Sequence, residues 1–192
     1  MLLSIRGREF TCALALIISV GTAFATMVPS LSFEQLTDQS EMVVAGDVMR
    51  TWSDWDAAHQ FIWTHHEIAV TSAYKGAAAK TVVVSEPGGV VGDRGMSIAG
   101  TVSYAPGENV VVFLQRMPNG YLRTTGWAQG KYVVDKAGLV HGAGASGGLE
   151  IVNPDGPGQR TPAAATPLRT LEGITATQFR SRVEARVRGA KQ

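Results

Sequence analysis

The chain has 192 residues, of which 45% are hydrophobic, and its 17 Lys and Arg against 16 Asp and Glu give a formal net charge of +1. This length is sufficient for one domain with its own hydrophobic core, and the balanced charge does not indicate a nucleic-acid-binding protein. A single cysteine excludes an intrachain disulfide and a zinc site built from several thiolates.

Residues 1–25 have the order of regions found in a secretory signal peptide. Two arginines precede a short apolar run, and small alanines precede the expected cleavage site between Ala25 and Thr26. A membrane span is the alternative, but the run is shorter than the roughly 18 to 20 apolar residues that a bilayer requires. We expect a protein exported to the periplasm or the extracellular medium, without a transmembrane anchor after cleavage. Because Cys12 lies in this segment, the mature chain is expected to be free of cysteine.

The part of the chain that follows, residues 26–141, is predicted to form an N-terminal helix and a β-barrel domain. Residues 31–40 indicate a short helix, because Ser32 and Gln35 fit a capping box. Beyond it, runs of β-branched and aromatic residues bounded by Gly, Pro, Asn and Asp are typical of strands. The predicted strands cover residues 41–52, 60–74, 81–87, 109–117, 121–128 and 130–135. Strands in the centre and a helix at each end favour a mainly β barrel or sandwich over alternating β-α units.

The C-terminal part of the chain is predicted to form a linker and a helix. Residues 142–170 are rich in Gly, Ala and Pro, which is typical of a loosely ordered linker. Residues 171–192 are basic, and a helix there would carry an apolar stripe formed by Phe179, Val183 and Val187. Residues 26–156 are acidic, with 8 Lys and Arg against 13 Asp and Glu. The basic helix either docks on this acidic part of the chain or binds an anionic partner. We favour docking, because the tail lacks the aromatic residues of a nucleic-acid surface and the dense basic cluster of a lipid-binding one.

A family resemblance rests on the segments "MVVAGDV", "HEIAVTSAYKG", "TVVVSEPGG", "APGENVVVFL" and "GWAQGKYVV". In their order, and in the corner formed by Tyr74, Lys75 and Gly76, residues 42–134 resemble a widespread type of uncharacterised exported bacterial protein. They are also similar to the netrin-like domains, which include the tissue inhibitors of metalloproteinases. This resemblance implies a small OB-like β-barrel of five to six strands. It does not imply protease inhibition, because the inhibitors chelate zinc through an N-terminal cysteine and Thr26 would stand at that place here.

Histidines and a glutamate occupy the predicted strand "FIWTHHEIAV", residues 61–70. Neighbours on a regular strand point to opposite faces, so His65 and His66 cannot both bind one ion unless a bulge intervenes. His65 and Glu67 share a face, and with His59 as a third ligand they are the candidate site for zinc or another divalent ion. The other interpretation is a solvated or hydrogen-bonded strand face. We favour the second, because a complete ligand set is missing.

Four large aromatic residues flank the acidic turn "SDWDAAHQ": Trp52, Trp55, Phe61 and Trp63. A hairpin would bring them to one end of the first two long strands. Exposed tryptophans beside Asp54 and Asp56 would suit a carbohydrate, peptide or protein ligand. We favour the other interpretation, that two or three of these rings fill the end of the barrel, because large aromatic residues are mostly buried.

The sequence thus favours an exported, non-enzymatic binding domain without a cofactor, whose partner is an unknown protein, peptide or carbohydrate and not nucleic acid. A metal-dependent hydrolase that uses His59, His65 and Glu67 is the alternative. Neither a carboxylate pair nor a base-activated nucleophile is apparent from the sequence, which favours binding over catalysis.

Overall fold

The computed structural model describes residues 26–77, 79–143, 149–152, 160–162 and 171–190, and the signal peptide predicted for residues 1–25 lies outside them. In the described part the protein is mainly β, as predicted, and also contains α-helices and a 3-10 helix. The strands are β1 (Thr26–Pro29), β2 (Met42–Trp55), β3 (Ile62–Lys75), β4 (Thr81–Pro87), β5 (Gly89–Val91), β6 (Arg94–Met96), β7 (Asn109–Arg116), β8 (Leu122–Thr124), β9 (Lys131–Val134), β10 (Val140–Gly142), β11 (Leu149–Val152) and β12 (Arg160–Pro162). The helices are α1 (Phe33–Gln39), the 3-10 helix η1 (Trp127–Gly130) and α2 (Ala176–Gly189).

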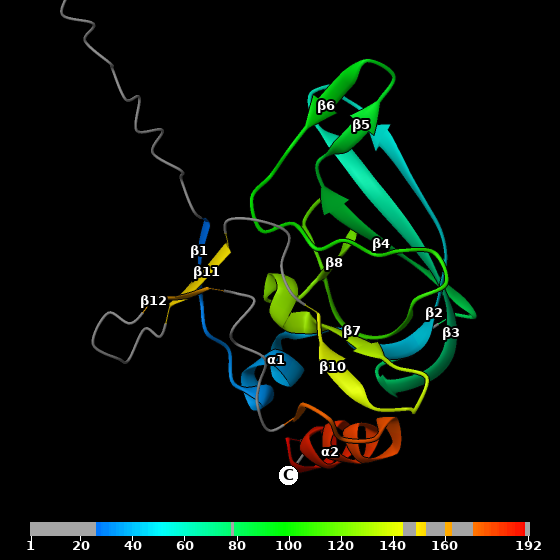
Figure 1. Ribbon diagram of the computed structural model, residues 1–192, viewed down its shortest axis with the longest axis vertical. Helices are drawn as coiled ribbons and strands as arrows, with labels where there is room; N and C mark the ends of the chain where they lie inside the picture. Colours follow the sequence, from blue (N-terminus) through cyan, green and yellow to red (C-terminus); the bar gives the residue numbers. More distant parts are fainter. Residues whose placement is uncertain (1–25, 78, 144–148, 153–159, 163–170, 191–192) are drawn as a thin grey trace, which may run out of the picture.

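The main sheet closes on itself as a ring (Figure 1). β2 pairs with β3 and β7, β3 pairs with β4, and β8 pairs with both β4 and β7. The pairing of β4 with β8, through Val84 and Leu122, is parallel, whereas the other pairs in the ring are antiparallel. β9 and β10 extend the sheet from β7, and β11 lies between β1 and β12 in a separate sheet.

β7 and the first part of β2, residues 42–46, are buried on both faces, which explains why their sequences are apolar runs instead of alternating ones. On the inner face, Val44, Val112 and Leu114 pack inside the ring with Val102 and Tyr104 of the segment that precedes β7. On the outer face, a second cluster packs against the helices; its members on β2, β7 and β9 are Val43, Ala45, Val111, Phe113 and Tyr132.

The C-terminal helix α2 is confirmed, and it docks as its apolar stripe predicts. Thr175 and Gln178 form a capping box at its start. Phe179 and Val183 are completely buried, and the Phe179 ring lies 5.0 Å from Tyr132 and 5.9 Å from Phe113, between ring centroids. In Figure 1 the helix lies at the end of the molecule opposite to the β5–β6 hairpin.

Several elements differ from the sequence-based prediction. The strand expected over 121–128 ends at Thr124, because Gly126 has a φ of 65° and the chain turns into η1. β5 and β6 form a hairpin in a part of the chain for which no strand was predicted. β11 and β12 lie within the segment predicted to be a linker. No helix in the described ranges is both long enough and apolar enough to span a bilayer.

Candidate functional site: an aromatic face on the outer side of the ring

The outer face of β2 and β3 carries a row of aromatic side chains. In the antiparallel register Trp52 lies opposite His65, and Asp54 lies opposite Trp63, so these side chains share one face. The rings of Trp52 and His65 are 5.3 Å apart. β2 and β3 approach closely at Gly46, where a Cβ atom would lie 2.2 Å from the carbonyl oxygen of Ala69. Glycine at this position thus permits the close approach of the two strands.

Tyr121, from the turn between β7 and β8, completes this row. Its ring lies 5.1 Å from that of Trp63 and 5.5 Å from that of His65, with edge-to-face geometry in both cases. The turn is built as its Asn-Gly sequence predicts: Gly120 has a φ of 86°, and its N–H donates to the Met117 carbonyl. Tyr121 reaches this face because β8 pairs with β4, next to β3 in the ring.

A hollow of about 420 Å³ opens between the β2–β3 turn and the β7–β8 turn. Its lining residues are Asp56, Ala57, Ala58, Phe61, Trp63, Asn119 and Tyr121. Phe61 is 45% exposed, and Trp63 and Tyr121 are half-buried, so three aromatic side chains offer apolar surface to solvent at one place. Apolar rings with an amide and a carboxylate beside them are the usual composition of a small-molecule site.

The two turns are held by side chains that bond to the backbone. Asp56 accepts hydrogen bonds from the N–H groups of Gln60 at 2.8 Å and Phe61 at 3.2 Å. Asn119 accepts from the N–H of Tyr121 at 3.1 Å. The backbone bonds to Asp56 lower the pKa of its carboxyl group. The hollow therefore has a fixed negative charge on one wall at neutral pH.

The rest of the face has balanced charge. Arg50 donates to Glu67 at 2.6 Å, and its guanidinium group lies 4.6 Å from the Trp52 ring centroid. Burial lowers the pKa of His65, and the charge of Asp54 offsets this only in part, so His65 is neutral at pH 7. A strongly anionic ligand would find few cations here and would meet Asp56 in the hollow.

The four aromatic residues chosen from the sequence do not all lie on one face of the hairpin. Phe61 and Trp63 line the hollow. Trp52 does not line it, but its ring packs on His65, which in turn contacts Tyr121 of the hollow. Trp55 is the residue after Asp54, so strand alternation turns it to the other face, and its ring stacks on His59 at 6.1 Å. Sequence analysis missed Tyr121, whose local signal was only its place after the Asn-Gly turn.

The residues considered as metal ligands are engaged in other contacts. His65 and Glu67 share a face as predicted, but Nδ1 of His65 lies 2.8 Å from the Ser85 hydroxyl, and Glu67 is paired with Arg50. His59 lies in the β2–β3 turn against Trp55. Within the described ranges, no three His, Cys, Asp or Glu residues are grouped so that they could hold an ion.

The contact between His65 and Ser85 has the form of a base and a nucleophile. Hydrolases use such a pair when the hydroxyl is open to the substrate. Ser85 is only 2% exposed and is not among the residues that line the hollow, so a substrate bound there does not contact its oxygen. The pair instead ties β3 to β4 and fixes the orientation of the His65 ring beneath Tyr121.

The sequence matches no protein-family model and no curated protein.

Proposed function

We propose that this protein is an exported, non-enzymatic binding domain that uses the hollow beside Phe61, Trp63 and Tyr121 to bind an uncharged carbohydrate. The observation that carries this proposal is the convergence of Tyr121 on Trp63 and His65 from a distant part of the chain. Aromatic rings provide flat apolar surface for the C–H groups of a sugar, and Asp56 and Asn119 supply polar groups at the edge.

The charge of the face favours an uncharged ligand over nucleic acid. Binding to a phosphate backbone requires several basic residues along one groove. Here Arg50 is already paired with Glu67, and Asp56 lies in the hollow itself. Sugar rings need no such cations, so the same aromatic residues suit a neutral saccharide.

The ring order supports an OB-type barrel, the fold that the netrin-like resemblance implies. If β2, β3, β4, β7 and β8 are numbered one to five, the order around the ring is 1-2-3-5-4, with strands three and five parallel. OB folds bind oligosaccharides and oligonucleotides on strands two and three, between the loop joining strands one and two and the loop joining strands four and five. The hollow described above lies between the corresponding turns.

Affinity electrophoresis and isothermal titration with neutral oligosaccharides test the proposal. We expect the mature protein to bind at least one of cellohexaose, chitohexaose and maltohexaose, and Trp63→Ala or Tyr121→Ala to weaken binding at least tenfold by removing stacking surface. Trp127→Ala is the matched control, because the Trp127 ring stacks on Arg123 and does not line the hollow.

Two outcomes would argue against this function. One is failure of the folded protein to bind any of the three saccharides. The other is covalent labelling of Ser85 by a fluorophosphonate probe, which would indicate a hydrolase. Export is tested separately by mass spectrometry of protein from the cell envelope and the medium, which should begin at Thr26.

A further inference from the structure

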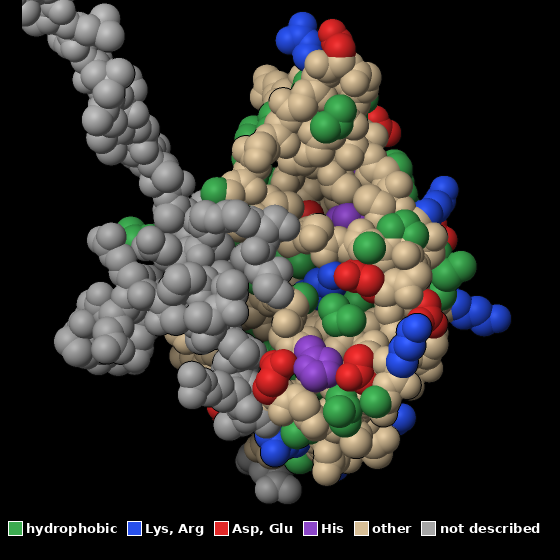
Figure 2. All heavy atoms as spheres, viewed as in Figure 1, with side chains coloured by type: hydrophobic (Ala, Val, Ile, Leu, Met, Phe, Trp, Pro, Cys, Tyr) green, Lys and Arg blue, Asp and Glu red, His purple; other side chains and the backbone are tan. Residues whose placement is uncertain are grey.

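A second and larger pocket lies on the inner side of the ring, on the face of β2 and β3 opposite to the aromatic face. Its volume is about 700 Å³. The lining residues are Thr51, Thr64, His66, Pro87, Gly88, Gly89, Met96, Ser97, Ile98, Ala99, Thr101, Val102, Ser103 and Tyr104. In Figure 2 a hollow is open on the near face below the β5–β6 end of the molecule, and a histidine side chain is visible inside it. The size is that of a site for a small organic molecule.

His66 lies at the base of this pocket with one ring nitrogen engaged. The residue is 3% exposed, and its ring packs 4.7 Å from the Tyr104 ring. Nδ1 lies 2.9 Å from the Thr51 hydroxyl, and that hydroxyl donates to the Tyr104 carbonyl at 3.3 Å. Because a hydroxyl group has only one proton to donate, we assign Thr51 as the acceptor from Nδ1–H. The lone pair of the imidazole is then on Nε2.

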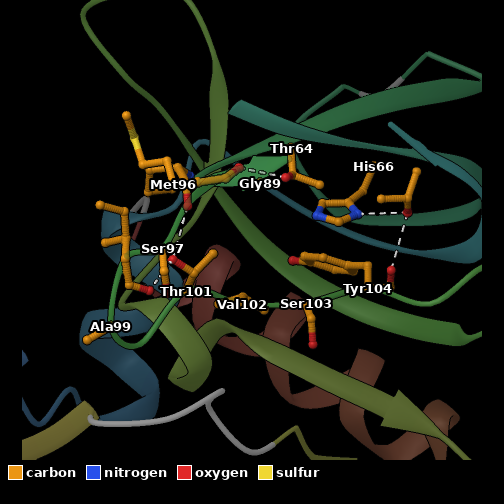
Figure 3. Close-up of a pocket in the computed structure, with 14 residues that line it drawn as sticks. Thr64, His66, Gly89, Met96, Ser97, Ala99, Thr101, Val102, Ser103 and Tyr104 are labelled. Atoms are coloured by element: carbon orange, nitrogen blue, oxygen red, sulfur yellow. Dashed lines mark hydrogen bonds between the residues drawn. The ribbon is translucent and has the colours of Figure 1, made fainter. Parts of the chain in front are cut away.

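Nε2 of His66 is the buried side-chain atom that lacks a hydrogen-bond partner, and no other such atom occurs in the described part of the chain. Nδ1 faces Thr51, and Figure 3 shows the other ring nitrogen on the side of Thr64, Gly89 and Met96. An unpaired buried acceptor is costly, so native proteins almost always satisfy it. A hydrogen-bond donor that enters from the pocket would do so.

Two hydroxyl groups that line the pocket are already used within the protein. Thr64 donates to the Gly88 carbonyl at 2.6 Å, and Thr101 donates to the Ile98 carbonyl at 2.8 Å. The remaining wall near them is mainly apolar, with Met96, Ile98 and Val102. None of the residues found to line this pocket is Asp, Glu, Lys or Arg, so a charged ligand would lose its hydration without an ionic partner.

We propose that this inner pocket binds a neutral, mainly apolar small molecule that carries one hydroxyl group, and that the hydroxyl donates its proton to Nε2 of His66. The apolar part of the molecule packs against Met96, Ile98 and Val102. This site is independent of the aromatic face, because His65 and His66 point to opposite sides of β3. The protein thus has a small-ligand site inside the ring in addition to the saccharide surface outside it.

The test compares 4-butylphenol with its methyl ether, 4-butylanisole, which has the same skeleton without the donor. We expect the full-length mature protein to bind the phenol about tenfold more tightly, because only the phenol satisfies Nε2. In His66→Phe this preference should shrink to about twofold or less, while the ether binds as before. His141→Phe is the matched control: the same substitution at a partly exposed histidine that does not line the pocket should keep the preference.

Ring-nitrogen NMR provides a readout that does not depend on the folding of a variant. In the wild type, His66 should show a proton on Nδ1, and its Nε2 resonance should move when the phenol is added, together with the methyl groups of Met96 and Ile98. Equal affinity of the two probes for the wild type, a preference that persists in folded His66→Phe, or no saturable binding would overturn the proposal. So would a response confined to the Trp63 indole, which would place the probe on the outer face.

Discussion

His65 and His66 are neighbours in β3 whose side chains lie on opposite faces of the sheet and bond to different strands. Nδ1 of His65 lies 2.8 Å from the Ser85 hydroxyl on β4, whereas Nδ1 of His66 lies 2.9 Å from the Thr51 hydroxyl on β2. This follows from strand alternation, which separates adjacent side chains. One histidine therefore belongs to the aromatic face and the other to the inner pocket.

His66 should make the protein less stable as the pH falls. Burial, followed by the charge of Lys131 and the proximity of His65, lowers its pKa from 6.5 to about 4. Between these values the unfolded chain takes up a proton that the folded chain does not, so the free energy of unfolding falls with decreasing pH. From pH 7.5 to 5.0 we expect a loss of about 2 kcal/mol from this residue. Urea unfolding at both pH values should show that His66→Phe loses less stability than the wild type; an equal loss would contradict the buried neutral state.

The pKa of His141 should be shifted in the opposite direction to that of His66, upwards. It bonds to Asp135 at 3.0 Å and to Glu172 at 3.1 Å, and these two contacts, in that order, raise its pKa above 6.5. The stabilisation that it provides is present below pH 6.5 and is lost as the pH rises through its folded pKa. NMR titration of the His141 ring protons should show the raised value, and Glu172→Gln should lower it. A pKa at or below that of an unfolded peptide would refute the arrangement.

Apolar burial should dominate the docking of α2. Phe179 is completely buried, so Phe179→Ala should cost about 3 to 5 kcal/mol and expose the C-terminal helix to protease. Arg186 pairs with Asp38, with Nε to Oδ1 at 3.0 Å and Nη2 in contact with Oδ2, but both side chains are more than a third exposed. Arg186→Ala should therefore destabilise the protein much less than Phe179→Ala. Thermal denaturation and limited proteolysis of both variants check this order, and the reverse order would show that the ion pair holds the helix.

Gly46 should resist substitution because of close backbone approach. A Cβ atom there would lie 2.2 Å from the Ala69 carbonyl oxygen, so Gly46→Ala forces β2 and β3 apart and should cost about 1 to 3 kcal/mol. Gly95→Ala is the control, because its added Cβ would meet Val90 at an ordinary 3.8 Å. The denaturation midpoint of Gly46→Ala should fall clearly below that of Gly95→Ala; equal midpoints would mean that the strands separate freely.

Local sequence patterns predicted the elements better than the sites. The cap residues Thr175 and Gln178 and the alternation around His65 and His66 act over a few residues, so they can be read directly. Tyr121 meets Trp63 only because β8 closes the ring, a pairing between segments far apart in sequence. The burial of His66 likewise depends on Tyr104, which enters the ring from the segment before β7. Contacts of this kind leave no periodic signal in the chain.

The most direct measurement of the proposed function is the NMR response of the tryptophan indole groups to a neutral hexasaccharide. If the hollow beside Phe61 and Tyr121 is the binding site, the Trp63 indole resonance should shift in a saturable way, and the Trp127 resonance should not. If cellohexaose, chitohexaose and maltohexaose all leave the Trp63 resonance unchanged, or shift Trp127 equally, the aromatic face is not a saccharide site.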